Sequence, residues 1–246
     1  MCTLIILYRP NNKWPLLVGG NRDEMLNRPW LEPANHWNNN ICAGKDKLAG
    51  GTWIGINKQG MIASILNRTN SLGNDKNKIS RGTIPIDILN KNHIEDAINY
   101  VKNINTQSFK PFNLFFGNNK KAFWAKATNN NKIIINNISP GMHFLDSYDL
   151  DSLKSPKFIY NLKVFKNLKI PNPDKNSWAS WKKFFLNEQY YHNQPLSAIN
   201  IKNNKNNYGT LCTSFLAVPN SNKLKTIFLF NNHLKENKNF YQIKTL

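Results

Sequence analysis

Residues 2–8 constrain the fold of this chain most, because this apolar run predicts a buried strand. A second apolar strand is predicted at 15–19, and the turn-forming residues 9–14 join the two strands as a hairpin. The polar motif Asn21-Arg22-Asp23-Glu24 follows the second strand. We therefore expect one end of this hairpin to bring the motif close to Cys2.

Residues 52–57 and 61–66 predict a second hairpin, with its turn at Asn57-Lys58-Gln59-Gly60. This hairpin ends at Asn67, so the ends of the two hairpins can bring Asn67 beside Cys2. We expect both side chains to face a common cleft with Asp23 close by. Less than about 10 Å should separate them, because a nucleophile and an oxyanion donor must reach the same carbonyl group.

The remaining segments indicate a mixture of helices and strands. Helical spacing is present at 84–90 and 93–104, and residues 177–186 predict an amphipathic helix that Ser177 could cap. Strands at both ends of the chain with helices between them indicate an α+β fold. The 246 residues fit one large or two small domains, and without a Gly/Ser linker we interpret residues 1–246 as a single domain. Further strands are predicted at 113–117, 121–127, 132–138, 211–218, 224–230 and 240–243.

The net charge of +19 raises the question of nucleic-acid binding. The lysines are scattered, however, and neither a dense basic block nor an RNA-binding aromatic motif is present. We therefore interpret the charge as a solvated surface, with nucleic-acid binding as the weaker alternative. Only five of the 33 basic residues are arginines, and chance clustering or sites that need a planar bidentate donor could explain their positions. They are Arg9, Arg22, Arg28, Arg68 and Arg81.

Composition also bears on compartment and cofactors. The sequence contains no apolar tract long enough to span a membrane, and residues 1–8 do not form a secretory signal. Cys2, Cys42 and Cys212 suggest neither a disulfide framework nor a metal site. We expect a cytoplasmic protein without stable membrane insertion or a metal, and the oligomeric state stays open.

The most reactive residue type in this pattern is the cysteine at position 2. Removal of Met1 would leave Cys2 with a free α-amine and a thiol, which together supply a base and a nucleophile. The α-amine has a pKa near ~8, so it can accept the proton of the thiol. We expect this removal because cysteine is small. The alternative is that Cys2 only packs in the first strand.

Several motifs in order resemble the NRDE family, also called the transport-and-Golgi-organisation family. This family is remotely similar to the cysteine N-terminal-nucleophile hydrolases, which include bile-salt hydrolase and penicillin V acylase. The resemblance implies a four-layer αββα sandwich. The motifs are Met1-Cys2-Thr3-Leu4, Gly20-Asn21-Arg22-Asp23-Glu24, Gly50-Gly51-Thr52-Trp53-Ile54-Gly55, Ile65-Leu66-Asn67-Arg68, Ser80-Arg81-Gly82 and Phe112-Asn113-Leu114.

The resemblance also implies roles for individual residues. Cys2 would be the nucleophile, Asp23 would orient the α-amine, and Asn67 would donate to the oxyanion. Alternatively, Asp23 and Asn67 are turn residues. Arg22 would lower the pKa of the thiol or hold a carboxylate or phosphate, or else pair with Asp23 or Glu24. The expected ligand-binding residues are Asn21, Arg22, Glu24, Arg68 and Arg81.

Two positions depart from the family pattern. Leu211 stands where the family has an arginine in Tyr208-Gly209-Thr210-Leu211-Cys212-Thr213. Ser147 stands in place of a second candidate oxyanion asparagine in His143-Phe144-Leu145-Asp146-Ser147. A lost oxyanion donor can cost about 3–4 kcal/mol of transition-state stabilisation.

Two functions therefore compete from the sequence. The first is hydrolysis of an amide or thioester of a small acyl compound through Cys2, with no cofactor required. The second is binding and trafficking of a small amphipathic or anionic ligand, and the resemblance suggests haem or acyl-CoA as that ligand. Haem would be a carried ligand held by an axial side chain in an apolar slot.

Overall fold

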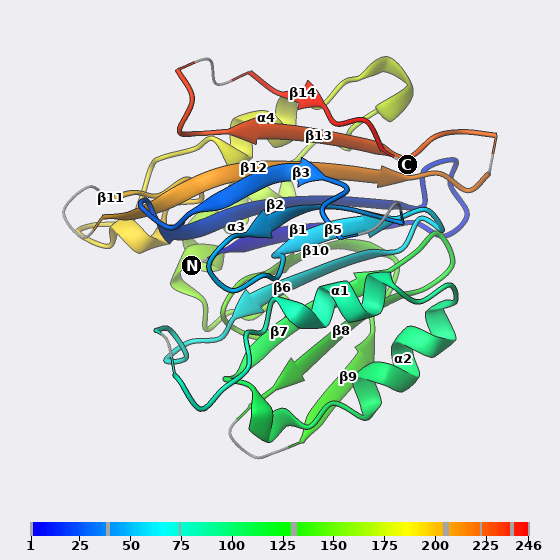
Figure 1. Cartoon of the computed structure of the whole chain (residues 1–246). Coiled ribbons are helices and arrows are strands. Elements are labelled where there is room, and N and C mark those ends of the chain that lie inside the picture. The colour runs from blue at the N-terminus through cyan, green and yellow to red at the C-terminus, as the bar shows by residue number, and fades with distance from the viewer. Residues whose placement is uncertain are drawn as a thin grey trace.

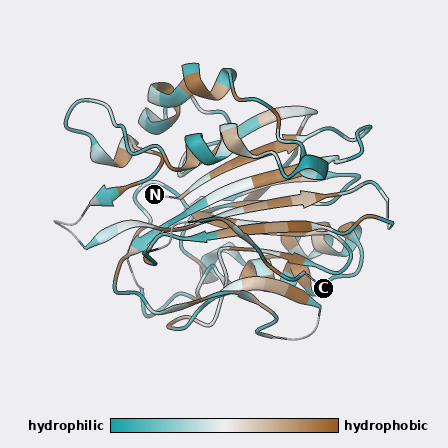
Figure 2. Ribbon diagram, turned by 90° about the horizontal axis from the view of Figure 1, so that it is seen from above, coloured by the Kyte–Doolittle hydropathy of each residue, from teal (hydrophilic) through white to brown (hydrophobic). Residues whose placement is uncertain are grey.

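The computed structural model describes residues 2–37, 40–73, 75–128, 132–203, 207–221, 223–236 and 239–245, so Met1 lies outside the described residues. Two antiparallel sheets face each other and carry helices on their outer faces (Figure 1). Figure 2 shows apolar residues concentrated along the strands and polar residues in the surrounding loops. This arrangement confirms the predicted α+β sandwich of four layers.

The first sheet has the order β10-β1-β2-β12-β13-β14, with β11 paired to β12. Its first two strands form the predicted N-terminal hairpin, in which Thr3 pairs with Asn21. Strand β12 then pairs along the other edge of β2 and places Thr210 opposite Asp23. The bounds are β1 (Thr3–Tyr8), β2 (Leu16–Met25), β10 (Gly141–Leu145), β11 (Lys202–Asn203), β12 (Tyr208–Val218), β13 (Ile227–Asn232) and β14 (Tyr241–Gln242).

The second sheet runs in sequence order from β3 to β9. Its central hairpin, β5 with β6, is the second predicted hairpin and ends at Asn67. The bounds are β3 (Trp30–Ala34), β4 (Ile41–Asp46), β5 (Ile54–Asn57), β6 (Ile62–Asn67), β7 (Phe112–Gly117), β8 (Ala122–Ala127) and β9 (Ile133–Asn137).

The helices cover the two outer faces of the sandwich. Helices α1 (Thr83–Leu89) and α2 (Ile94–Lys102) pack on the second sheet. Helices α3 (Pro156–Lys166) and α4 (Ala179–Phe185) pack on the first sheet. Short 3-10 turns lie at Thr106–Ser108, Pro173–Lys175 and Pro195–Ser197. No helix within the described ranges is long and apolar enough to cross a membrane.

Strand β1 illustrates why the sheets stack. Leu4, Ile6 and Tyr8 point into the core between the sheets, while Ile5 and Leu7 point toward α3 and α4. Side chains alternate between the two faces of a strand, and both faces of β1 are covered. A strand covered on both faces needs a continuous apolar run, which is the pattern of residues 2–8.

The structure corrects several sequence-based element predictions. Strand β2 continues through Met25, so the motif Asn21-Arg22-Asp23-Glu24 lies within a strand and not after it. The polar side chains of this motif suggested a turn. Pairing with β12 instead satisfies the backbone hydrogen-bonding groups along this stretch and keeps it extended. Ser177 does not cap α4, because the cap position is Trp178 and no side chain bonds there. The sequence predictions did not include β3, β4, β10, β11 and α3.

Candidate active site

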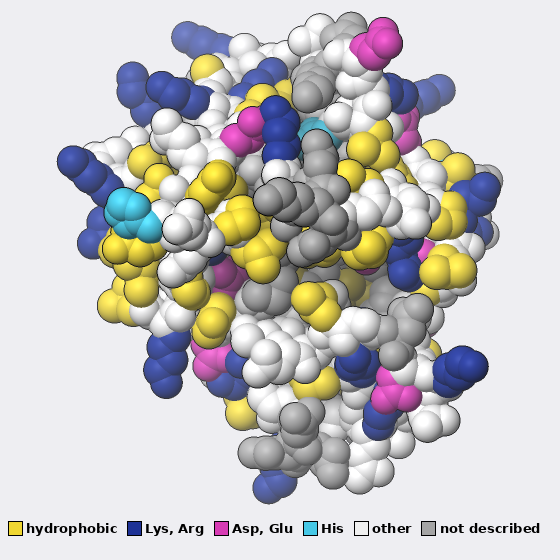
Figure 3. All heavy atoms as spheres, turned by 90° about the vertical axis from the view of Figure 1, so that its left-hand side faces the viewer, with side chains coloured by type: hydrophobic (Ala, Val, Ile, Leu, Met, Phe, Trp, Pro, Cys, Tyr) yellow, Lys and Arg dark blue, Asp and Glu magenta, His cyan; other side chains and the backbone are white. Residues whose placement is uncertain are grey.

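A cavity of about 600 Å³ lies where the N-terminal end of β1 meets the end of β6. Its lining includes Cys2, the stretch of β2 from residue 22 to 25, Asn67, and part of the loop between β6 and α1. Figure 3 shows the left-hand side of the view in Figure 1, where apolar and cationic side chains are interspersed. The two predicted hairpins therefore bring Cys2, Asp23 and Asn67 to one cavity.

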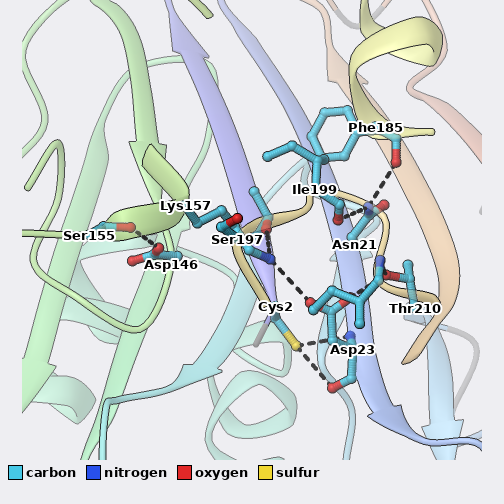
Figure 4. A network of polar contacts seen from close by, with 12 residues as sticks. Cys2, Asn21, Asp23, Asp146, Ser155, Lys157, Phe185, Ser197, Ile199 and Thr210 are labelled. Carbon is cyan, nitrogen blue, oxygen red and sulfur yellow. Dashed lines mark hydrogen bonds and ion pairs between the residues drawn. The ribbon is translucent and has the colours of Figure 1, made fainter. Parts of the chain in front are cut away.

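The backbone of Asp23 holds the thiol of Cys2 (Figure 4). The Asp23 backbone N–H donates to Cys2 Sγ at 3.3 Å, and the thiol lies 3.6 Å from the Asp23 carbonyl oxygen that can accept its proton. Burial raises the pKa of the Cys2 thiol, and the negative charge of Asp23 raises it further. The thiol is therefore neutral at neutral pH, and nucleophilic attack would need a base to remove its proton.

The carboxylate of Asp23 is buried and bound on both oxygens. Thr210 Oγ1 donates to Oδ1 at 2.6 Å, and Lys157 Nζ lies 3.4 Å from Oδ2. Lys157 also donates to Thr3 Oγ1 at 3.0 Å, in the residue that follows Cys2. This network fixes Asp23 next to the start of β1, where an α-amine on Cys2 would lie.

Sequence reasoning missed Lys157, which is 4 % exposed and sits in the first turn of α3. Ser155 accepts from the backbone N–H of Phe158, and Pro156 occupies the first helical position. This Ser-Pro pair is a helix-start signal that could have located α3. The sequence would still predict an exposed lysine here, because lysines are rarely buried without a partner. Its partner Asp23 is 134 positions away, and no local pattern links the two residues.

Arg22 lies in the wall of the cavity and is paired. Its Nη2 donates to Asp46 Oδ2 at 2.9 Å, and the guanidinium lies 4.3 Å from the centre of the Trp53 ring. Arg28 Nε donates to the same Asp46 oxygen at 2.6 Å. Asp46 thus compensates the charge of Arg22, and the buried Nη1 has no hydrogen-bond partner among the residues that the structure describes. This pairing differs from the ion pair with Asp23 or Glu24 that the sequence offered as one alternative.

Two of the expected ligand-binding residues lie away from the cavity lining. Asn21 Nδ2 donates to the carbonyl oxygens of Phe185 and Ile199, at 2.9 Å each. Arg68 donates to Asn113 Oδ1 at 2.6 Å and to Asp149 at 2.7 Å. Their side chains thus tie elements of the protein together. Glu24 and Arg81 do line the cavity with Cys2 and Asn67.

The two departures from the family pattern also lie outside the lining. Leu211 is fully buried at a bulge in β12, where the register with β2 shifts between Thr210 and Cys212. The backbone carbonyl of Ser147 accepts from the N–H of Thr69 at 3.1 Å. These two positions therefore contribute to the packing and backbone hydrogen bonding of the fold and not to the lining of the cavity.

Sequence comparison identifies the family. The model of the family described as Transport and Golgi organisation 2 matches residues 1–228. A transport and Golgi organization protein 2 homolog of Bos taurus is 30% identical over 125 residues, which are 46% of this chain and 44% of the bovine protein. An uncharacterized protein of Saccharomyces cerevisiae is 36% identical over 132 residues, which are 48% of this chain and 42% of the yeast protein. These matches span less than half of either relative.

Comparison with solved structures identifies the fold. An N-acylethanolamine-hydrolyzing acid amidase ortholog from Caenorhabditis elegans superposes with a TM-score of 0.59 at 15% identity, covering 90% of this chain and 96% of that one. A conjugated bile acid hydrolase from Clostridium perfringens gives 0.55 at 12% identity, covering 99% and 92%. At such identities the likeness concerns the fold alone. The chain belongs to the Transport and Golgi organisation 2 family and has the fold of the N-terminal-nucleophile hydrolases.

Proposed function

We propose that this chain hydrolyses an amide or thioester of a small acyl compound, with Cys2 as the nucleophile. One observation carries the proposal: the Cys2 thiol contacts the backbone of Asp23 in the lining of a cavity that Asn67 also lines. The fold shared with an acid amidase and a conjugated bile acid hydrolase supports it. The reaction would take place in the reducing cytosol, where the three free cysteines of the chain stay reduced.

The proposed reaction begins once Met1 has been removed. While Met1 is attached, the nitrogen of Cys2 is an amide and cannot act as a base. The freed α-amine, oriented by the Asp23 carboxylate, accepts the thiol proton, and Sγ attacks the carbonyl carbon of the substrate. The side-chain amide of Asn67 donates to the oxyanion that forms.

The tetrahedral intermediate then collapses. The protonated α-amine gives its proton to the leaving amine or thiol, and the acyl group stays on Sγ as a thioester. Water attacks this thioester while the α-amine accepts one of its protons. As the carboxylic acid is released, the α-amine passes this proton to the departing Sγ, which returns Cys2 to its starting state.

The test follows the acyl group. Protein shown by intact mass spectrometry to begin at Cys2 is mixed with the N-acetylcysteamine thioester of decanoic acid. The mass of the N-terminal peptide should increase by one decanoyl group, and decanoate should accumulate. Cys2→Ala should show neither change.

A matched control isolates the α-amine. Insertion of a lysine between Met1 and Cys2 prevents removal of Met1, because methionine aminopeptidase requires a small second residue. This variant keeps the thiol and should lose hydrolysis. Equal turnover by the variant and the processed protein would rule out amine-assisted catalysis.

The second candidate is a carrier that binds an amphipathic ligand such as haem or acyl-CoA without turnover. The observation that favours it is a raised pKa of the Cys2 thiol, due first to burial, in a chain with Leu211 at the family's arginine position. Haem or decanoyl-CoA should then raise the unfolding temperature of both the processed protein and Cys2→Ala. A ligand at 100 times its Kd stabilises by about 2.7 kcal/mol. Binding without any released acid or free CoA would favour the carrier.

A further inference from the structure

Arg81 lines the same cavity as Cys2 and is held by neutral groups only. Its Nη1 donates to the backbone oxygen of Ser71 at 3.2 Å, to Ser71 Oγ at 3.0 Å and to the backbone oxygen of Pro111 at 2.9 Å. Among the described ranges no carboxylate lies within ion-pair distance of Arg81, whereas Arg22 and Arg68 each have one. Its guanidinium is thus positioned but not neutralised.

The pKa and the unpaired donors of Arg81 also indicate that its guanidinium is available to an anion. Burial lowers the pKa of its guanidinium to about 10, while the negative charge of Glu24, and that of Cys2 once its thiol is ionised, acts in the opposite direction. Nε and Nη2 have no hydrogen-bond partner among the residues described, and neither belongs to the buried atoms left unpaired. Two donors of a fixed guanidinium are therefore open to the cavity. Such a fork matches the two oxygens of a carboxylate.

The outer part of the cavity has a different character. Leu48, Leu72 and Ile79 line it, and their exposed fractions are 64%, 50% and 54%. Large apolar side chains this exposed around one opening suit the apolar part of a ligand. The charged residues near this part of the lining are of both signs, because Lys76 and Lys110 are cations while Glu24 and Asp75 are carboxylates.

We propose that Arg81 binds a carboxylate on the amine portion of an acyl amide whose apolar chain extends along Leu48, Leu72 and Ile79. Arg81 and Cys2 line the same cavity, and in such a ligand the scissile carbonyl lies between the carboxylate and the apolar chain, so it could be presented to Cys2. The substrate class is then an acylated amino acid. This inference rests on the proposed function, because it takes Cys2 as the point of attack.

The test uses two ligands of equal length that differ only in charge. N-decanoylglycine carries a carboxylate, and N-decanoylglycinamide carries a neutral amide in its place. Each is titrated by calorimetry into Cys2→Ala, which cannot turn either over. We expect the carboxylate ligand to bind about tenfold more tightly or better, as a charge-assisted bond requires. Equal affinity for the two ligands would overturn the inference.

Two further variants in the Cys2→Ala background locate the preference. Arg81→Gln should bring the two affinities within about twofold of each other, whereas Lys78→Gln, a matched change of a rim cation, should leave most of the preference. Arg81→Lys should give an intermediate result, because it keeps the charge and loses the fork. A preference that survives Arg81→Gln in a folded protein would also overturn the inference.

The outcomes separate this inference from the proposed hydrolysis. If N-decanoylglycine binds through Arg81 but is never cleaved by the processed protein, the anion site stands and hydrolysis fails. If the decanoyl thioester acylates Cys2 while both glycine ligands bind equally, hydrolysis stands and the role of Arg81 fails.

Discussion

Asp46 neutralises the arginines in the wall of the cavity, and its replacement by asparagine gives the sharpest test of that wall. Asp46 Oδ2 accepts from Arg22 at 2.9 Å and from Arg28 at 2.6 Å. Oδ1 accepts from the backbone N–H groups of Leu48 and Ala49, at 3.0 and 2.9 Å. Asn keeps the size of the side chain and one carbonyl oxygen, so Asp46→Asn removes the charge with little loss of packing.

The size of the effect follows from burial. The Arg22 side chain is 5% exposed and would lose its counter-ion, a change that costs about 3–5 kcal/mol for a buried pair. Arg28 is 18% exposed, so its lost pair should add about 1 kcal/mol or less. We expect Asp46→Asn to reduce the free energy of unfolding by about 4 kcal/mol at pH 7. For a chain of this size that corresponds to a fall in Tm of about 8–16 °C.

The effect should also depend on pH. Burial alone raises the pKa of Asp46, but hydrogen bonds from Arg28 and the Ala49 N–H, with the charges of Arg28 and Arg22, lower it below its usual value. A carboxyl whose folded-state pKa is lowered contributes stability above its unfolded pKa of about 3.8 and loses it as pH falls through the folded value. The difference between wild type and Asp46→Asn should therefore be complete above about pH 5 and shrink progressively below about pH 4, so that it is already smaller at pH 3.

Urea unfolding at pH 7 and pH 3 measures both quantities. Asp149→Asn is the matched control, since Asp149 also pairs with two cations, Arg68 and Lys126, but is 40% exposed. We expect the control to lose about 1 kcal/mol or less. A loss at pH 7 no larger than that of the control, or one that is the same at both pH values, would refute the dependence of buried Arg22 on Asp46.

The sequence predicts the central hairpins of both sheets because their signals are local. Alternating or continuous apolar runs, each followed by turn residues, fixed β1 with β2 and β5 with β6. Those hairpins place Cys2 and Asn67 in the lining of one cavity. What local patterns missed is the length of β2, since its polar end becomes a strand only through pairing with β12.

The partners of the charged residues could not be predicted in the same way. Arg22 pairs with Asp46, 24 positions away, and Lys157 contacts Asp23, 134 positions away. Each pair depends on how the strands and helices pack together, which the periodicity of apolar residues in the sequence does not predict. The placement of arginines early in the chain did indicate fixed sites, yet only the structure separates the paired Arg22 from Arg81, which has neutral partners.

Two further substitutions test the walls of the candidate site. Gly51→Ala would bring its Cβ to 2.4 Å from the Gly82 carbonyl carbon, so the two segments must move apart at a cost of about 1–3 kcal/mol, which thermal unfolding measures. Lys157→Met would remove a cation 3.4 Å from the Asp23 carboxylate, whose side chain is fully buried. Because a buried charge loses a partner, we expect a loss of about 3 kcal/mol in urea unfolding, together with slower acylation of Cys2 by the decanoyl thioester. Lys166→Met, a change of an exposed lysine on the same helix, should alter neither quantity. Full stability and unchanged acylation in Lys157→Met would mean that Asp23 is held without this lysine.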